Sequence, residues 1–297
     1  MKQNSIFIGL SALAVYVGLL SGCTAEDMDV QTMEDYGREI RMTASMQSVT
    51  RTANSLQDAQ LSQDVTVGVY GLSGGNTISN GDNAGYTADD SGNLTTTDNT
   101  MVWPDEGSVT IYAYAPKQES WSYSADKTFT VSEDQSSEAG YLASDLVWAT
   151  ATPESQTTVN LGFAHKLSRI QLTVATDANT TLTDAEVKIV NTKPSAPFTL
   201  ATGTVGTETG DATDITIGSN ITLEKGGSTT LYGILIPQTV DANTTLIRIT
   251  DGDKVWRYHY SEAKTFAGGG AYSATITISS SRFSSAISTT PATDPAN

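Results

Sequence analysis

The chain has 297 residues, of which 33 are acidic and 16 are lysine or arginine, giving a formal net charge of −17. A charge of this sign repels phosphate backbones and argues against nucleic acid as a partner. One cysteine excludes an internal disulfide, and the few histidines lack metal-site spacing, so neither a cofactor nor a metal is predicted.

Residues 1–22 have the three-part layout of a secretory signal peptide. Lys2 is positively charged, residues 6–20 are largely apolar, and Ser21 and Gly22 are small. An apolar run of this length is shorter than the roughly 20 residues that span a bilayer. We therefore expect the segment to direct export and to be removed.

Leu20-Ser21-Gly22-Cys23 resembles the lipobox of bacterial lipoproteins, in which the cysteine becomes the new N-terminus and carries acyl chains such as palmitate. The alternative for Cys23 is a buried structural thiol. Several acyl chains would hold the protein firmly at the outer membrane, whereas one would hold it only marginally. Residues 23–38 form an acidic tether, whose start resembles the export tags of surface lipoproteins in Bacteroidetes.

Alternation of apolar and polar residues begins at residue 39 and predicts β-strands through to about residue 280. In EIRMTASM, the residues Ile40, Met42, Ala44 and Met46 share one face. Further strands are predicted over residues 65–72, 109–116, 168–174, 185–190, 214–223, 229–237, 245–250 and 254–260. No long stretch has a helical period, so helices should be few and short.

The predicted strands fall into two groups and indicate an all-β fold with two β-sandwich domains. A polar break at residues 151–156 separates the groups, which gives domains over 39–153 and 154–280, followed by a tail over 281–297. Residues 74–99, rich in Gly, Asn, Asp and Thr, are expected to form a long loop. Asp251-Gly252-Asp253 predicts a hairpin turn.

Enzymatic motifs are weak or incomplete. Residues 71–75 match the G-x-S-x-G pattern of a nucleophile elbow, but the residues that follow cannot sustain the helix that an elbow opens, so a turn is predicted. His165 and His259 have no partner at metal or catalytic spacing, and each is expected to be an ordinary strand residue. Asp89-Asp90 and residues 251–253 lack the frame of a calcium loop. No pair of carboxylates is marked for glycoside hydrolysis, and no enzymatic activity is predicted.

Several segments together resemble the fimbrillin family of Bacteroidetes over residues 38 to 280. They are VTVGVYG, VWP, VTIYAYAP, DLVWATA, VNLGFAHKLSRIQLTV and YGILIPQ, in that order. The resemblance implies a lipoprotein precursor with two β-sandwich domains of transthyretin-like type. It also implies assembly with other fimbrillin subunits into a fimbrium, the type V pilus, on the outer membrane, where it supports cell adhesion to a host or bacterial surface receptor.

In that family, an Arg-specific protease removes the tether and first strand, and an extended segment of another subunit fills the groove. By resemblance, residues 39–46 are the displaced strand and Arg51 is the cleavage site, with Arg38 and Arg41 less favoured. The alternative for Arg51 is an ordinary exposed loop arginine. Burying each large apolar side chain contributes about 1.5 to 3 kcal/mol, so the vacated groove would favour a replacement.

The tail differs from the donor extensions of stalk subunits because its large apolar residues are only Phe283 and Ile287. Their spacing of four lets both face one groove, which makes the tail a candidate donor. Stalk, tip and anchor positions all remain open. The alternative function is a monomeric surface lipoprotein that binds glycans through aromatic residues, and the tryptophans could serve it or pack in the core: Trp103, Trp121, Trp148 and Trp256.

Overall fold

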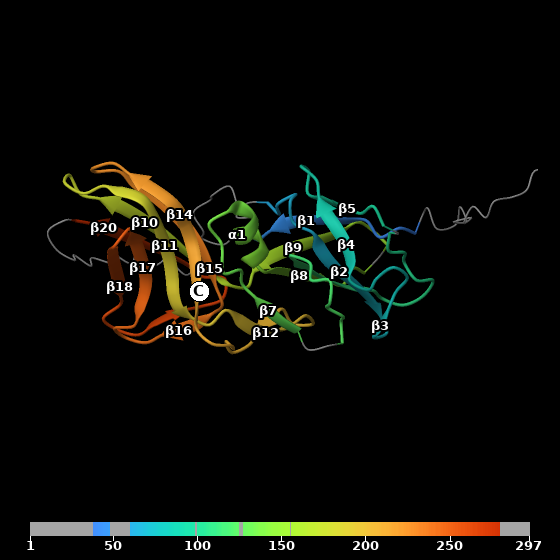
Figure 1. The fold of residues 1–297 in the computed structure, drawn as a ribbon. Helices are drawn as coiled ribbons and strands as arrows, with labels where there is room; N and C mark the ends of the chain where they lie inside the picture. Colours follow the sequence, from blue (N-terminus) through green and yellow to red (C-terminus); the bar gives the residue numbers. More distant parts are fainter. Residues whose placement is uncertain (1–37, 48–59, 99, 125–126, 155, 280–297) are drawn as a thin grey trace, which may run out of the picture.

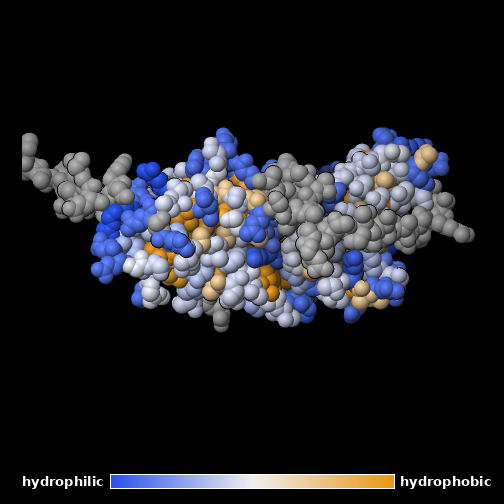
Figure 2. All heavy atoms as spheres, turned by 180° about the vertical axis from the view of Figure 1, so that it is seen from behind, coloured by the Kyte–Doolittle hydropathy of each residue, from blue (hydrophilic) through white to orange (hydrophobic). Residues whose placement is uncertain are grey.

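The structure is a computed structural model that describes residues 38–47, 60–98, 100–124, 127–154 and 156–279. Its described part is elongated, with two β-rich bodies arranged end to end (Figure 1). The surface seen from behind is mostly hydrophilic, with apolar residues in separate patches (Figure 2). The all-β prediction is confirmed, and among the described residues no helix is long and apolar enough to cross a membrane.

The first body is a single sheet that closes on itself, and we call it the barrel. Its strands are β1 (Met42–Met46), β2 (Val67–Ser73), β3 (Asn76–Thr77), β4 (Ala84–Ala88), β5 (Asn93–Thr95), β6 (Thr110–Ala115), β8 (Val147–Ala151) and β9 (Val159–His165). The order is β3-β2-β4-β5-β1-β9-β8-β6, and β2 also pairs with β6. This last pairing joins the two sides of the sheet and leaves β1 in its interior.

The second body, which we call the sandwich, has two principal sheets. One contains β15 (Ser228–Leu235), β10 (Ser168–Thr176) and β20 (Ala271–Ile278); the other contains β14 (Thr213–Leu223), β11 (Leu182–Thr192), β17 (Thr245–Asp251) and β18 (Lys254–His259). They pack closely, because a Cβ built on Gly233 of β15 would lie 2.7 Å from side-chain atoms of Ile189 and Ile217. A ribbon of β16 (Gln238–Val240) and β19 (Lys264–Phe266) adjoins them.

A third group of elements links the two bodies. Strand β7 (Lys127–Thr130) pairs with β12 (Ser195–Thr199), which in turn pairs with β13 (Thr204–Val205). The Trp121 ring stacks on Phe198 with centroids 5.7 Å apart. Helix α1 (Glu138–Ser144) is capped at its N-terminus by Ser137, whose hydroxyl accepts a hydrogen bond from the Gly140 amide. It spans only seven residues, as the lack of helical periodicity predicted.

The strands of the structure differ from the sequence-based prediction in two respects. Strands β3, β4 and β5 occupy residues expected to form a long loop, so that prediction was wrong. They are short and separated by turns at Asn80, Asn83 and Gly92, which have positive φ angles, so no long alternation marks them. Strand β9 follows the expected boundary at residue 153 yet pairs with β1 and β8, so the barrel extends past that boundary.

The hairpin predicted at Asp251-Gly252-Asp253 is confirmed. Strands β17 and β18 pair antiparallel across it, from Asp251 opposite Lys254 to Thr245 opposite His259. Gly252 has a φ of 58°, a left-handed conformation that glycine adopts without a steric penalty.

Candidate functional site

Strand β1 is an interior strand of the barrel, bonded on both sides. It pairs antiparallel with β5, where Met42 is opposite Leu94 and Thr43 is opposite Asn93. On its other side it pairs parallel with β9 over five positions, from Met42 opposite Val159 to Met46 opposite Phe163. The strand therefore closes the gap between β5 and β9.

Backbone hydrogen bonds extend this pairing beyond the strand itself. The Ile40 amide donates to the Met101 carbonyl at 2.8 Å, and the Trp103 amide donates to the Arg38 carbonyl at 2.8 Å. At the far end, the Gln47 amide donates to the Phe163 carbonyl at 2.7 Å. Residues 38–47 are thus held along their whole length, and we call them the β1 segment.

The side chains of the β1 segment divide between the barrel interior and the solvent. Ile40 is 1% exposed and Met42 is 2% exposed, while Ala44 and Met46 are half-buried and pack against the core. Arg41 and Ser45, on the opposite face, are exposed. The four apolar residues that alternate in the sequence therefore face inward, with burial decreasing toward Met46.

Removing the β1 segment would expose a slot between β5 and β9. Leu94, Val159 and Leu161 would flank this slot, because these buried residues lie opposite Met42 or Ala44 of the segment on the two neighbouring strands. Two strand edges, one on β5 and one on β9, would lose their partners. Loss of Ile40 and Met42 alone would remove about 1.5 to 3 kcal/mol each of apolar burial.

The other predicted site residues have different positions. Arg38 forms an ion pair with Asp105 at 2.7 Å and donates to the Trp103 carbonyl, so it is tied to the barrel. Arg41 lies within the β1 segment, where its carbonyl accepts a hydrogen bond from the Val159 amide at 2.8 Å. Cys23, Arg51, Phe283 and Ile287 lie outside the described residues.

The weaker enzymatic motifs have structural roles. The G-x-S-x-G stretch forms the turn from β2 to β3, where Gly74 and Gly75 have φ angles of 57° and 83°. The Asp89 carboxylate accepts hydrogen bonds from the Asn93 side chain and from the Asn93 and Ser91 amides, and these bonds lower its pKa. Across the described residues, no group of three or more His, Cys, Asp or Glu side chains could hold a metal.

The histidines also lack a catalytic setting. His165 is buried, and its Nδ1 lies 2.8 Å from Oδ1 of Asp145, whose side chain is buried as well. The pair lies where the barrel leads into the sandwich, away from solvent. His259 is exposed on β18.

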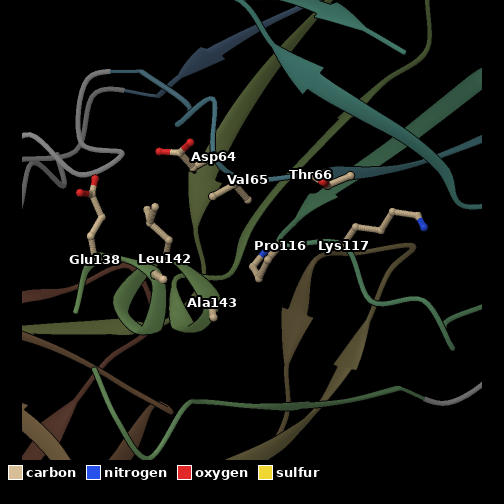
Figure 3. A pocket seen from close by; sticks show the side chains of 9 residues that line it. Asp64, Val65, Thr66, Pro116, Lys117, Glu138, Leu142 and Ala143 are labelled. Carbon is tan, nitrogen blue, oxygen red and sulfur yellow. The ribbon is translucent and has the colours of Figure 1, made fainter. Parts of the chain in front are cut away.

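A hollow of about 500 Å³ lies beside α1 (Figure 3). In the close-up, Asp64 and Glu138 lie on one side of it and Lys117 extends away on the other, where its ammonium pairs with Glu119 at 2.5 Å. The charged groups therefore do not converge on a common point. Nothing in this arrangement resembles a nucleophile with its base.

The tryptophans provide no exposed sugar-binding platform within the described part of the chain. Trp103 and Trp121 are buried, whereas Trp148 and Trp256 are half-buried and pack against the core. Trp148 donates its indole N–H to the Leu200 carbonyl at 2.8 Å and thereby ties β8 to the segment after β12. The alternative of a glycan-binding lipoprotein gains no support from these positions.

Comparison with known proteins decides the family, because a model described as fimbrillin-like matches residues 50–293. The chain belongs to the fimbrillin-like family. This fimbrillin-like chain therefore has the family and fold of fimbrial structural and adhesion proteins, not of enzymes. The match supports a fimbrial subunit role at the cell surface.

Several solved structures share the fold of this fimbrillin-like chain, two of them with a TM-score of 0.65. A candidate cell adhesion protein from Bacteroides uniformis has a TM-score of 0.65 and 24% identity, covering 86% of this chain and 100% of that one. A candidate cell adhesion protein from Bacteroides ovatus has a TM-score of 0.65 and 20% identity, covering 85% of this chain and 96% of that one. No curated protein matches the sequence.

Proposed function

We propose that this chain is a structural subunit of a surface fimbrium that assembles by replacement of its β1 segment. The observation that supports this most directly is the position of that segment. It is the first described segment of the chain, yet it fills an interior place in the barrel. Cutting the chain after it would free one strand without interrupting any other described strand.

Arg51 suits such a cut better than the two alternative arginines. Cleavage after Arg38 would leave residues 39–47 attached to the body, and cleavage after Arg41 would divide the β1 segment. Arg51 lies between the segment and the rest of the barrel in sequence, so cleavage there would release the segment intact. We propose that the chain reaches the outer membrane as a lipoprotein through Cys23 and is then processed at Arg51.

The replacement strand must present apolar side chains with the same alternation. Phe283 and Ile287 in the tail are four residues apart, as are Met42 and Met46 in the β1 segment. Because strand residues two and four apart share a face, both tail residues could point into the vacated slot of another subunit. Backbone hydrogen bonds to β5 and β9 would be restored at the same time.

The test combines residues 52–297 with a synthetic peptide of residues 39–47. We expect the peptide to raise the melting temperature, because it restores the apolar contacts and both strand pairings. A peptide with Met42→Glu should have no effect, since it buries a charge. The matched control peptide with Ser45→Glu places the same charge on the exposed face and should act like the unmodified one. Strand replacement would be refuted if residues 52–297 alone were fully stable and monomeric and if none of the three peptides changed their melting temperature.

A further inference from the structure

Four strands form a continuous bonded series through the molecule. Strand β1 pairs parallel with β9, and β9 leads into β10 through Lys166 and Leu167 alone. Strand β10 then pairs parallel with β20 over eight positions, from Arg169 opposite Ala271 to Thr176 opposite Ile278. The series therefore connects the first described strand with the last.

The series also runs from one end of the molecule to the other. In Figure 1 the chain enters β1 from the barrel end of the molecule, and β20 ends at the opposite end, within the sandwich. The start of β1 and the end of β20 thus face in opposite directions. Tension applied to the two termini would pull paired parallel strands lengthwise past one another.

We propose that β1, β9, β10 and β20 form a load-bearing axis that transmits tension through the subunit in shear. The proposal rests on the part of the proposed function that makes this chain a fimbrial subunit, because such a subunit is pulled through its two ends. A strand that replaces β1 and keeps its direction would inherit this geometry. Each cross-strand hydrogen bond contributes only about 0.5 to 1.5 kcal/mol. Shear loads all of these bonds together, whereas peeling breaks them one at a time, so a paired strand resists shear much better than peeling.

The short link between β9 and β10 is held from both bodies. The Lys166 amide donates to the Leu146 carbonyl of the barrel side at 2.9 Å, and the Gly269 amide of the sandwich donates to the Leu167 carbonyl at 3.0 Å. The Lys166 ammonium lies 4.5 Å from the Trp148 ring. These contacts fix the backbone where the axis crosses from one body to the other.

Contacts away from the axis brace the same junction. The Gln135 side chain accepts a hydrogen bond from the Ile234 amide at 2.7 Å and donates one to the Ile234 carbonyl at 3.0 Å. Strands β7 and β12 pair over four positions, from Ser195 opposite Thr130 to Phe198 opposite Lys127. Separating the two bodies would break all of these bonds, so we expect the junction to hold under tension.

Single-molecule pulling on the full chain tests the axis. One variant of the full chain can be pulled in two directions, in shear and in peeling. It carries Cys23→Ser, Gln47→Cys and a tag at each end, and the new thiol can be attached because Gln47 is exposed. Pulling between the two tags shears β1 against β9. Pulling between the introduced thiol and the C-terminal tag peels them apart, because force then reaches both strands at their C-terminal ends.

We expect the first rupture to need a severalfold higher force in the shear geometry than in the peeling geometry. Equal forces would overturn the proposal, and so would a first event in the shear geometry that separates the two bodies while β1 stays bound. Because the intact chain is pulled with its own β1, failure here would leave strand replacement standing. Failure of the peptide experiment would refute strand replacement and leave the axis standing.

Discussion

Met42 is one of two β1 residues that are paired on both sides of the strand, and it lies opposite Leu94 of β5 and Val159 of β9. It is 2% exposed, so Met42→Ala would leave a cavity in the barrel wall. We expect the free energy of unfolding of the full chain to fall by about 2 to 5 kcal/mol. Urea denaturation measures this change.

Ser45 supplies the matched control, because it lies in the same strand but is exposed. Ser45→Ala should change the free energy of unfolding by no more than about 0.5 kcal/mol. Equal effects of the two substitutions would contradict the inward orientation of Met42.

Tyr258 lies in the core of the sandwich, where burial raises its pKa to about 12. Unfolded tyrosine has a pKa near 10, so the unfolded chain loses this proton first as pH rises. The stabilisation is therefore complete below pH of about 10 and is lost progressively as pH rises toward 12. Urea denaturation at several alkaline pH values should show this decline.

Tyr258→Phe should make the alkaline decline shallower without abolishing it. Burial also raises the pKa of Tyr86, Tyr114 and Tyr260, which would continue to contribute. An identical pH dependence in the variant and the unmodified chain would show that Tyr258 does not contribute to the decline.

Among the elements, the β1 segment could be predicted because its signal is local. The alternation of Ile40, Met42, Ala44 and Met46 is visible in eight consecutive residues and sets which face turns inward. Its partners could not be predicted, because pairing with β9 depends on how the chain closes over more than a hundred intervening residues. Sequence reasoning therefore found the strand but not that both its edges are bonded.

The junction between the bodies was missed for a related reason. Strand β7 has four residues and β12 contains Pro197, so neither carries a clear strand pattern. The buried Gln135 side chain forms hydrogen bonds with the backbone of Ile234. No pattern of side chains in the sequence indicates a contact of this kind. These contacts join residues that are far apart in the sequence, so no local pattern indicates them.

Backbone pairing of β1 is tested by Ala44→Pro in the peptide of residues 39–47. The Ala44 amide donates to the Gly92 carbonyl at 2.7 Å, and proline has no amide hydrogen. Leaving that carbonyl unpaired costs about 1 to 3 kcal/mol, which weakens binding to residues 52–297 roughly 5- to 150-fold. Calorimetry measures the affinity.

Ala44→Gly keeps the amide hydrogen and serves as the control peptide. Its added backbone freedom should cost only roughly 0.5 to 1 kcal/mol. If both peptides bind equally well, the peptide does not use the hydrogen bond seen in β1.

For the whole molecule, assembly should require both a free slot and a donor. In a chain that carries Arg282→Lys, which keeps Phe283 and Ile287 attached, an Arg-specific protease should release an N-terminal fragment that ends at Arg51 and produce ladders of stable oligomers on unboiled gels. Arg51→Lys should abolish both, because the protease no longer recognises the site. Arg41→Lys is the matched control and should leave both unchanged, since that residue is bound within the barrel wall.

Replacing both tail residues, Phe283→Ser and Ile287→Ser, separates the two requirements. Cleavage at Arg51 should proceed normally, but the ladder should disappear because the tail can no longer fill the slot with apolar side chains. When the cleaved tail variant is mixed with the cleaved, unmodified chain, the variant should be incorporated at one end of an oligomer only. Its slot still accepts the tail of another subunit, but its own tail cannot fill a slot. A full ladder from the tail variant alone would assign the donor role to a segment other than the tail.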